Sequence, residues 1–485
     1  MFIVIPYLTT DPVIYGIYTV CISISIFLVY ADLGFLGAGQ KYAAEHFAKG
    51  ELKEEIKVVG FTHFILLIFL LLFSIGFLFL SIHPELLIKS LDHGKQETIA
   101  SSLLLIIALF TPVTLLQRLL QMIFGIRLED YIVQRTNIVA SLLKILSVLF
   151  FFRNGQYNIV GYFLFTQIVN LLAALLNLII ARQRYNYDFR ALLKSIHFNA
   201  AVFAKTKRLA FTSLFLTFTW ILYYELDPTV IGKFIGANQV AIYAIGLTIL
   251  SFFRTILGIL FSPFNARFNH FIGLEDEKGL KSFYLQVTTI LAPIVVIPIL
   301  TIALMASPLI LSWVGVDYSG SVEIAQYLVL CNLFAFITYP ASMLLMAKER
   351  LREMYLINTL IPLVYWSGIA LTYNVFGLKS FAIFKLVAFA LSVIAYYFIM
   401  LKFLQINFIS SLKEIFKPIL FPIILVIISS FLIRDYLPHQ KSKINLLIVA
   451  ISAGCIILGS FILQYFLSAN WRNQISKTLR TYQNT

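Results

Sequence analysis

The segment from Val58 to Ser81 reads VVGFTHFILLIFLLLFSIGFLFLS and contains no Asp, Glu, Lys or Arg. An α-helix needs about 20 consecutive apolar residues to cross a hydrocarbon core about 30 Å thick, so this segment is long enough to span a membrane. Similar runs recur along the 485 residues, of which 60% are apolar and only 12% charged. A transmembrane barrel would instead show segments of about ten residues with alternating polarity. The sequence therefore predicts an all-α polytopic membrane protein.

Thirteen segments are expected to cross the membrane, after a stub at about 1–8 that is too short to do so. They are 14–36, 58–81, 99–125, 132–152, 158–181, 209–226, 240–264, 284–306, 324–346, 355–373, 380–401, 418–433 and 445–467. The stub predicts either a truncated first helix or a re-entrant first element. No charged leader or cleavage site indicates a signal peptide. Cys21, Cys331 and Cys455 all fall in apolar runs, so we expect them in the core rather than in disulfides.

Lys and Arg residues are unevenly divided between the two sides of these spans. Of the 37, 25 lie in alternate loops and the C-terminal tail, counting Arg135 at the start of its span with the loop before it. Eight lie in the opposite loops, and four lie deeper within spans. Short loops rich in Lys and Arg stay on the cytoplasmic side, so the richer loops and the C-terminus are predicted to be cytoplasmic. This bias accounts for the net charge of +14 without a nucleic-acid partner.

Two pairs of similar motifs predict an internal repeat of six helices. Asp11-Pro-Val-Ile-Tyr-Gly-Ile-Tyr18 resembles Asn238-Gln-Val-Ala-Ile-Tyr-Ala-Ile245, and Arg127-Leu-Glu-Asp-Tyr131 resembles Arg350-Leu-Arg-Glu-Met354. The offsets nearly agree: Tyr243 lies 228 residues after Tyr15, and Arg350 lies 223 residues after Arg127. Many transporters consist of two such repeats with a site between them. We expect an N-terminal lobe at 1–181, a basic cytoplasmic linker at 182–208, a C-terminal lobe at 209–403, and two extra helices with a cytoplasmic tail at 404–485.

Four basic residues lie within predicted spans: Arg118, Lys144, Arg254 and Lys385. A charge at the centre of a membrane helix costs roughly 2.5–3.5 kcal/mol, so such residues normally face a protein interior or a water-filled cavity. Lys385 lies only about five residues into its span, and we expect its side chain to reach the outer interface. An apolar chain that contains four such cations is predicted to form a pathway for something negatively charged.

Arg254 lies in the middle of its span, in Ser251-Phe-Phe-Arg254-Thr-Ile. A guanidinium binds phosphate oxygens through two parallel hydrogen bonds, which predicts contact with a diphosphate or an acidic sugar. The alternative is an ion pair between helices, with Asp32 or Asp227, that fixes packing.

Lys144 is also central in its span, and Arg118 lies between Gln117 and Gln121 on a helix that Pro112 is expected to break. Residues three to four apart share one face of a helix, so the two glutamines form a polar face beside Arg118. We predict substrate contacts for Lys144, Arg118, Gln117 and Gln121. The alternative for each is contact with a partner helix.

Three acids lie at or near membrane depth: Asp32, Glu225 and Asp227. They are candidates for coupling or gating with protons or sodium ions. The alternative is structural, with Asp32 at a helix end pairing with Arg or Lys and the other two solvated at the external mouth. We predict no catalytic residue and no metal site, because no His pair has metal spacing and no nucleophile or phosphate-loop motif is present.

The chain resembles the polysaccharide transporters, the Wzx-type O-antigen and capsule flippases of the multidrug/oligosaccharidyl-lipid/polysaccharide superfamily. The resemblance covers essentially the whole chain and includes the fourteen-element plan with its central basic loop. The motifs that carry it are Tyr224-Glu-Leu-Asp227, Val230-Ile-Gly-Lys-Phe-Ile-Gly236, Ala241-Ile-Tyr-Ala-Ile-Gly246, Ala31-Asp-Leu-Gly34 and Gln40-Lys-Tyr-Ala-Ala-Glu45. The chain departs from the family in its short first helix and in Pro228, where the family more often has a basic residue.

This resemblance implies a flippase of the bacterial inner membrane. Its substrate would be an oligosaccharide linked to undecaprenyl diphosphate, moved to the periplasmic leaflet for cell-surface polysaccharide or lipopolysaccharide synthesis. The implied cycle is alternating access around a cationic cavity. No cofactor is expected, and the candidate coupling ions are H⁺ and Na⁺. Membrane lipids and a polysaccharide polymerase or ligase are the implied partners.

Three other functions are alternatives for this sequence. A multidrug or cation antiporter of the same superfamily should expose acids rather than bases at mid-membrane. A membrane polysaccharide polymerase or ligase would need a sizeable external loop, whereas the external loops here are short. A purely structural membrane protein would give no reason to bury four cations.

Overall fold

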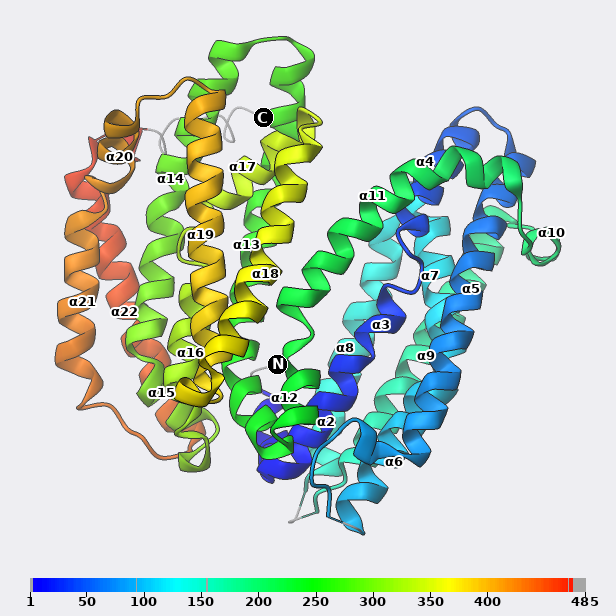
Figure 1. The fold of residues 1–485 in the computed structure, drawn as a ribbon, viewed down its shortest axis with the longest axis horizontal. Coiled ribbons are helices and arrows are strands. Elements are labelled where there is room, and N and C mark those ends of the chain that lie inside the picture. The colour runs from blue at the N-terminus through cyan, green and yellow to red at the C-terminus, as the bar shows by residue number, and fades with distance from the viewer. Residues whose placement is uncertain (1–2, 93, 154–155, 470, 474–485) are drawn as a thin grey trace. The chain divides into compact units, whose positions relative to one another are not determined.

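The computed structural model describes residues 3–92, 94–153, 156–469 and 471–473 (Figure 1). Regular structure in these ranges is entirely helical, which confirms the predicted all-α fold. The chain divides into two compact units, 1–241 and 242–485. This division lies further along the chain than the predicted basic linker.

Among its described residues, the N-terminal unit contains twelve complete α-helices and one 3₁₀ turn. They are α1 (Ile5–Leu8), α2 (Pro12–Ile24), α3 (Ile26–Val29), α4 (Phe35–Ala48), α5 (Leu52–Ile82), η1 (Pro84–Leu86), α6 (Lys95–Leu109), α7 (Thr111–Ile126), α8 (Asp130–Phe151), α9 (Ile159–Tyr185), α10 (Phe189–Ser195), α11 (Ala200–Tyr224) and α12 (Asp227–Phe234).

The C-terminal unit begins within α13. Its described residues contain the rest of α13, nine more α-helices and one 3₁₀ turn. They are α13 (Ala237–Gly273), α14 (Glu277–Leu304), α15 (Ala306–Trp313), η2 (Val316–Tyr318), α16 (Ser321–Leu330), α17 (Ala335–Ala347), α18 (Leu351–Phe376), α19 (Lys379–Phe403), α20 (Phe408–Phe416), α21 (Leu420–Arg434) and α22 (Lys443–Leu467).

The helices account for the predicted spans. Within the described ranges, nine are long and apolar enough to cross a membrane, and four bent pairs raise this number to 13. The bent pairs are α6 with α7 (41°), α11 with α12 (48°), α16 with α17 (46°) and α20 with α21 (47°). Thirteen spans match the number expected from apolar runs. The break between α6 and α7 falls at Phe110, two residues before Pro112, as the proline predicted.

The first predicted span, 14–36, is wrong at its C-terminal end. α3 ends at Val29, and a turn with left-handed backbone at Leu33 (φ 49°) and Gly34 (φ 78°) precedes α4. A Cβ atom at Gly34 would lie 2.4 Å from the carbonyl oxygen of Ala210 in α11. Close packing of α11 therefore requires glycine here, and the chain turns where the apolar run continues.

The two units repeat the same order of elements. Ala237, which begins α13, lies 225 residues after Pro12, which begins α2, and the starts of α14 and α5 have the same separation. The bent pairs α6–α7 and α16–α17 also occupy corresponding positions. The repeat inferred from two short motifs therefore extends to whole helices. In the N-terminal unit, α11 packs on α4 and α12 packs on α2.

The two extra C-terminal helices form a hairpin. α21 and α22 contact each other, and both pack on α14 (Figure 1). The prediction that all three cysteines lie in the core is wrong for Cys455, because it lies on an exposed face of α22. The predicted cytoplasmic tail lies largely outside the described residues, at 474–485.

A buried ion pair joins the ends of α5 and α7. The Arg127 guanidinium donates to both carboxylate oxygens of Glu55, at 2.9 Å and 3.3 Å, and the Glu55 residue is fully buried. The rings of Phe47, Tyr185 and Tyr187 lie 4.6–5.2 Å from the guanidinium carbon. These contacts connect four separate segments of the N-terminal unit through one side chain.

A second pair lies beside it, in the turn before α8. Arg184 donates to the two Glu129 oxygens at 2.7 Å and 2.6 Å, and the Tyr185 hydroxyl donates to the same carboxylate. Hydrogen bonds from Arg184 and Tyr185 lower the pKa of Glu129 from 4.5 to about 2. A lowered carboxylate pKa means that the pair stabilises the fold above pH 4.5, and that this stabilisation is lost as the pH falls towards 2.

We predict that Glu55→Gln destabilises the protein by about 3 kcal/mol, because it leaves the buried Arg127 charge without a carboxylate. The measurement is the unfolding midpoint of the purified protein in detergent. Lys57→Gln is the matched control, since the Lys57–Glu54 pair is exposed on the same helix and should contribute less than about 1 kcal/mol. Equal losses in the two variants would contradict a structural role for the buried pair.

Candidate functional site

A cavity of about 350 Å³, which we term the inner pocket, lies in the N-terminal unit. It is formed by α2, α3, the α6–α7 break, α8 and α9. The lining residues are Tyr18, Ile22, Ser25, Leu28, Val29, Ile107, Phe110, Thr114, Lys144, Tyr162, Phe163, Thr166 and Gln167. The lining contains one cation and no carboxylate. A bend in one span thus opens a polar space between helices that are otherwise apolar.

Lys144 is the charged member of the inner pocket. Its Nζ donates to Asn170 Oδ1 on α9 at 2.6 Å, and Asn170 Nδ2 donates to Gln167 Oε1 at 3.2 Å. The partners are neutral amides, so the ammonium is held in place without being neutralised. It can therefore attract an anion into the pocket.

The structure places the predicted polar face of α7 near the same pocket. Gln117 Nε2 donates to the Asn170 carbonyl oxygen at 3.5 Å, and Arg118 Nη2 donates to the Val29 carbonyl oxygen at 3.1 Å. Arg118 Nη1 is 3.5 Å from Gln121 Oε1, and Gln121 is exposed. Gln117 thus shares Asn170 with Lys144, and Arg118 is bound to a residue that lines the pocket.

Aromatic rings and hydroxyls complete the lining. The rings of Tyr18 and Phe163 meet edge to face at 6.0 Å. Ser25, Thr114 and Thr166 add hydroxyl groups. Hydroxyls and amides can donate to and accept from sugar hydroxyls, while an ammonium binds a phosphate oxygen. In the described part of the chain, no group of three His, Cys, Asp or Glu residues could hold a metal ion.

The three predicted coupling acids lie outside the lining of the inner pocket. Asp32 Oδ2 accepts a hydrogen bond from the Leu36 backbone N–H at 2.9 Å, so it caps the start of α4. Glu225 follows α11 and is half-buried, and Asp227 begins α12 and is fully buried. Two of these acids therefore flank the bend between α11 and α12.

The remaining two cations belong to the C-terminal unit. Arg254 is half-buried in α13, next to the buried Phe253. Lys385 is fully buried in α19, with its Nζ 5.3 Å from the centre of the Tyr365 ring. The expectation that Lys385 reaches the outer interface is therefore wrong. Its face of α19 points into the unit, where the electron-rich face of Tyr365 attracts the ammonium.

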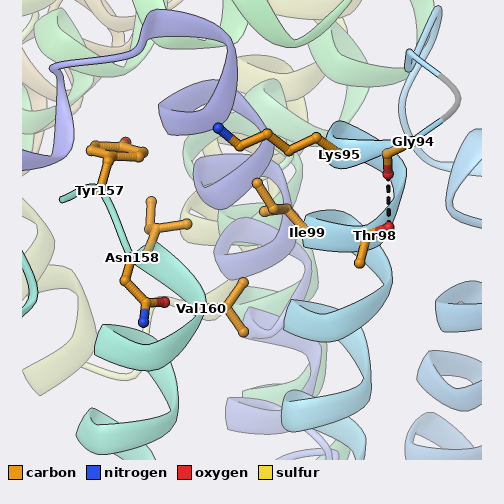
Figure 2. Close-up of a pocket in the computed structure, with 8 residues that line it drawn as sticks. Gly94, Lys95, Thr98, Ile99, Tyr157, Asn158 and Val160 are labelled. Carbon is orange, nitrogen blue, oxygen red and sulfur yellow. Dashed lines mark hydrogen bonds between the residues drawn. The ribbon is translucent and has the colours of Figure 1, made fainter.

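A second cavity, about 340 Å³ and termed the outer pocket, lies where α6 and α9 begin (Figure 2). Lys95 and Thr98 line it from α6, and Tyr157 and Asn158 line it from the segment before α9. The Tyr157 hydroxyl donates to the Leu8 carbonyl oxygen at 2.5 Å. Both pockets therefore lie along α6 and α9. On α9, Val160 lines the outer pocket and Tyr162 lines the inner pocket.

Sequence reasoning missed Asn170, which binds Lys144, and Gln167, which accepts a hydrogen bond from Asn170. Both are uncharged, so a search for charges in apolar spans passed over them. They are three residues apart and share one face of α9. A search for amides at the same depth as a buried cation would have found them.

Solved structures with the same fold include transporters. A structure of the lipid II flippase MurJ in an inward closed conformation matches with a TM-score of 0.66 and 14% identity, covering 96% of this chain and 97% of that chain. An inward-facing MATE family multidrug resistance transporter of the MOP superfamily matches with a TM-score of 0.65 and 12% identity, covering 83% and 93%. No protein-family model matches the sequence, and no curated protein matches it. The likeness establishes a shared fold.

We predict that the inner pocket is open to water and attracts anions. A cysteine at Ser25, in a Cys455→Ser background, should react with an anionic methanethiosulfonate roughly threefold or more faster than with a cationic one. Adding Lys144→Gln should abolish this preference. Measured labelling rates that show no reaction, or a faster reaction with the cation, would contradict the prediction.

Proposed function

We propose that this protein is a flippase that moves a polyprenyl-diphosphate-linked oligosaccharide from the cytoplasmic to the periplasmic leaflet. The observation that carries the proposal is the inner pocket, where Lys144 is held by the neutral amide of Asn170 and no carboxylate lines the wall. A cation that costs free energy at membrane depth is best explained by an anion that it binds.

The inner pocket fits the charged part of such a substrate. Lys144 would contact a diphosphate oxygen, and the amides of Gln117 and Gln167 would contact the first sugar. A volume of about 350 Å³ is at the small end for ligand pockets, so the rest of the headgroup would lie outside it. The polyprenyl tail needs no polar pocket and would stay in lipid. Arg254, in α13 of the C-terminal unit, is a separate candidate for binding a diphosphate or an acidic sugar.

The likeness to MurJ supports a lipid-linked substrate. That protein is a lipid II flippase, and its structure and this chain align over nearly their full lengths. Together with the resemblance of the motifs to polysaccharide transporters, this favours a sugar for surface polysaccharide synthesis, such as O-antigen or capsule, in a bacterial inner membrane. The two repeated blocks would alternate in access, with Asp32, Glu225 and Asp227 as candidates for coupling to H⁺ or Na⁺.

Antiport of drugs or other cations is the second candidate, and the likeness to a MATE transporter favours it. A cation site requires an acid at membrane depth. The inner pocket offers Lys144 and no acid, so this reading needs a site elsewhere, such as the buried Asp227.

The test is a leaflet assay in proteoliposomes with a fluorescent polyprenyl-diphosphate oligosaccharide. Wild-type protein should move the lipid, and Lys144→Gln and Arg254→Gln should each slow movement about tenfold, the loss of one charge-assisted hydrogen bond. Lys402→Gln is the control, because Lys402 is an exposed lysine at the end of α19.

Three outcomes decide between the candidates. Movement that is slowed by Lys144→Gln and by Arg254→Gln but not by Lys402→Gln supports the proposal. Movement that none of the variants alters would reduce Lys144 and Arg254 to packing residues. A folded protein that moves an organic cation but not the lipid would replace the flippase with an antiporter.

A further inference from the structure

A narrow groove of about 280 Å³ runs between α8 and α9, and we term it the lipid groove. Its floor consists of Ala140, Val169 and Ala173, which are only 3–9% exposed and form a separate small apolar cluster. The small side chains of Ala140 on α8 and Ala173 on α9 leave space above the floor. The groove therefore results from small residues at the floor between larger residues on either side.

Apolar side chains form the walls of the lipid groove. Val139 and Leu143 rise on the α8 side, and Leu172 and Leu176 rise on the α9 side. They are 46–58% exposed, on two helices that are each long and apolar enough to span a membrane. Exposed apolar walls at this depth face hydrocarbon, so the occupant of the groove is a lipid chain.

Arg135 closes one end of the lipid groove. Its guanidinium carbon lies 5.2 Å from the centre of the Tyr131 ring, and within the described ranges it forms no ion pair with a carboxylate. Glu129, six residues earlier, is already bound by Arg184. The cation is thus available to an anionic headgroup, and Tyr131 has the amphipathic character typical of the interface.

The lengths agree with a lipid of the cytoplasmic leaflet. From Thr136 to Leu143 the groove follows eight residues of α8, whose seven steps of 1.5 Å give about 10 Å. Half of a hydrocarbon core is about 15 Å, so the groove reaches from the interface towards mid-membrane. The positive-inside bias puts Arg135 on the cytoplasmic side, and basic sites between membrane helices on that side bind anionic headgroups.

We infer that the lipid groove binds one anionic phospholipid of the cytoplasmic leaflet, with its phosphate on Arg135 and one acyl chain over Ala140 and Ala173. This site is separate from the inner pocket, which lies on the other side of the α8–α9 pair. The inference depends on the membrane location of the chain and not on the proposed flippase activity.

The test is native mass spectrometry of the detergent-purified protein with phosphatidylglycerol or phosphatidylcholine. Wild type should retain one phosphatidylglycerol in preference to phosphatidylcholine. Arg135→Gln should weaken that retention about fivefold, the contribution of one basic residue near a headgroup. Ala173→Leu should weaken it by filling the floor. The controls are Lys53→Gln, a distant exposed lysine, and Ala450→Leu, an exposed alanine on α22.

Other outcomes overturn the inference. Equal retention of both lipids, or equal losses in the control variants, would mean non-selective boundary lipid. If polyprenyl phosphate displaces phosphatidylglycerol from wild type but not from Arg135→Gln, the groove binds a prenyl chain instead of a phospholipid. Because Ala173→Leu can disturb helix packing, Ala140→Leu and the unfolding midpoint of each variant are measured alongside. Loss of retention in well-folded Arg135→Gln, with both controls unchanged, supports the site.

Discussion

The structure depends on one constraint: hydrocarbon cannot solvate a charge or an unpaired polar group, so each must find its partner within the protein. Lys144 binds the amide of Asn170, Lys385 lies over the ring of Tyr365, and Arg118 binds a backbone carbonyl. At the end of α5, the same constraint produces the ion pair between Glu55 and Arg127. Asn170 and the Val29 carbonyl are neutral, so these two contacts hold Lys144 and Arg118 in place without neutralising their charge.

Because of this constraint, polar and apolar residues of the α8–α9 pair lie in separate places. Lys144 and Asn170 meet on one side, next to the inner pocket. One turn closer to Arg135, Ala140 and Ala173 leave the lipid groove on the other side. Thr136 and Asn177 hydrogen bond at 3.0 Å at the end near Arg135, so the two helices stay in register there. One antiparallel pair thus presents a polar side to the protein interior and an apolar side to lipid.

Much of the fold could be predicted from the sequence because the length of an apolar run is a local property. The thirteen spans and the repeat follow from residue counting. The break after Val29 could not be predicted, because it depends on contact between Gly34 and α11, which is distant in sequence. Nor does every bend have a proline at the break: none lies between Leu330 and Ala335, where α16 and α17 meet.

The site was predictable in part, for a related reason. Lys144 and Arg118 were identified because they are charges in apolar runs. The spacing of Gln117 and Gln121 indicated a polar face. Lys385 was placed wrongly because distance along a span indicates depth but not which face of the helix points inward. Asn170 was missed because the partner of a buried cation lies on another helix, and a neutral amide gives only a weak signal in the sequence.

Recognition of a diphosphate by cations at membrane depth can be measured as equilibrium binding. The comparison is between a polyprenyl-diphosphate sugar and the same lipid lacking its phosphates. We expect binding at least about tenfold tighter with the diphosphate, a preference that Lys144→Gln removes. Equal affinity for the two lipids, or an equal preference in Lys144→Gln, would contradict it.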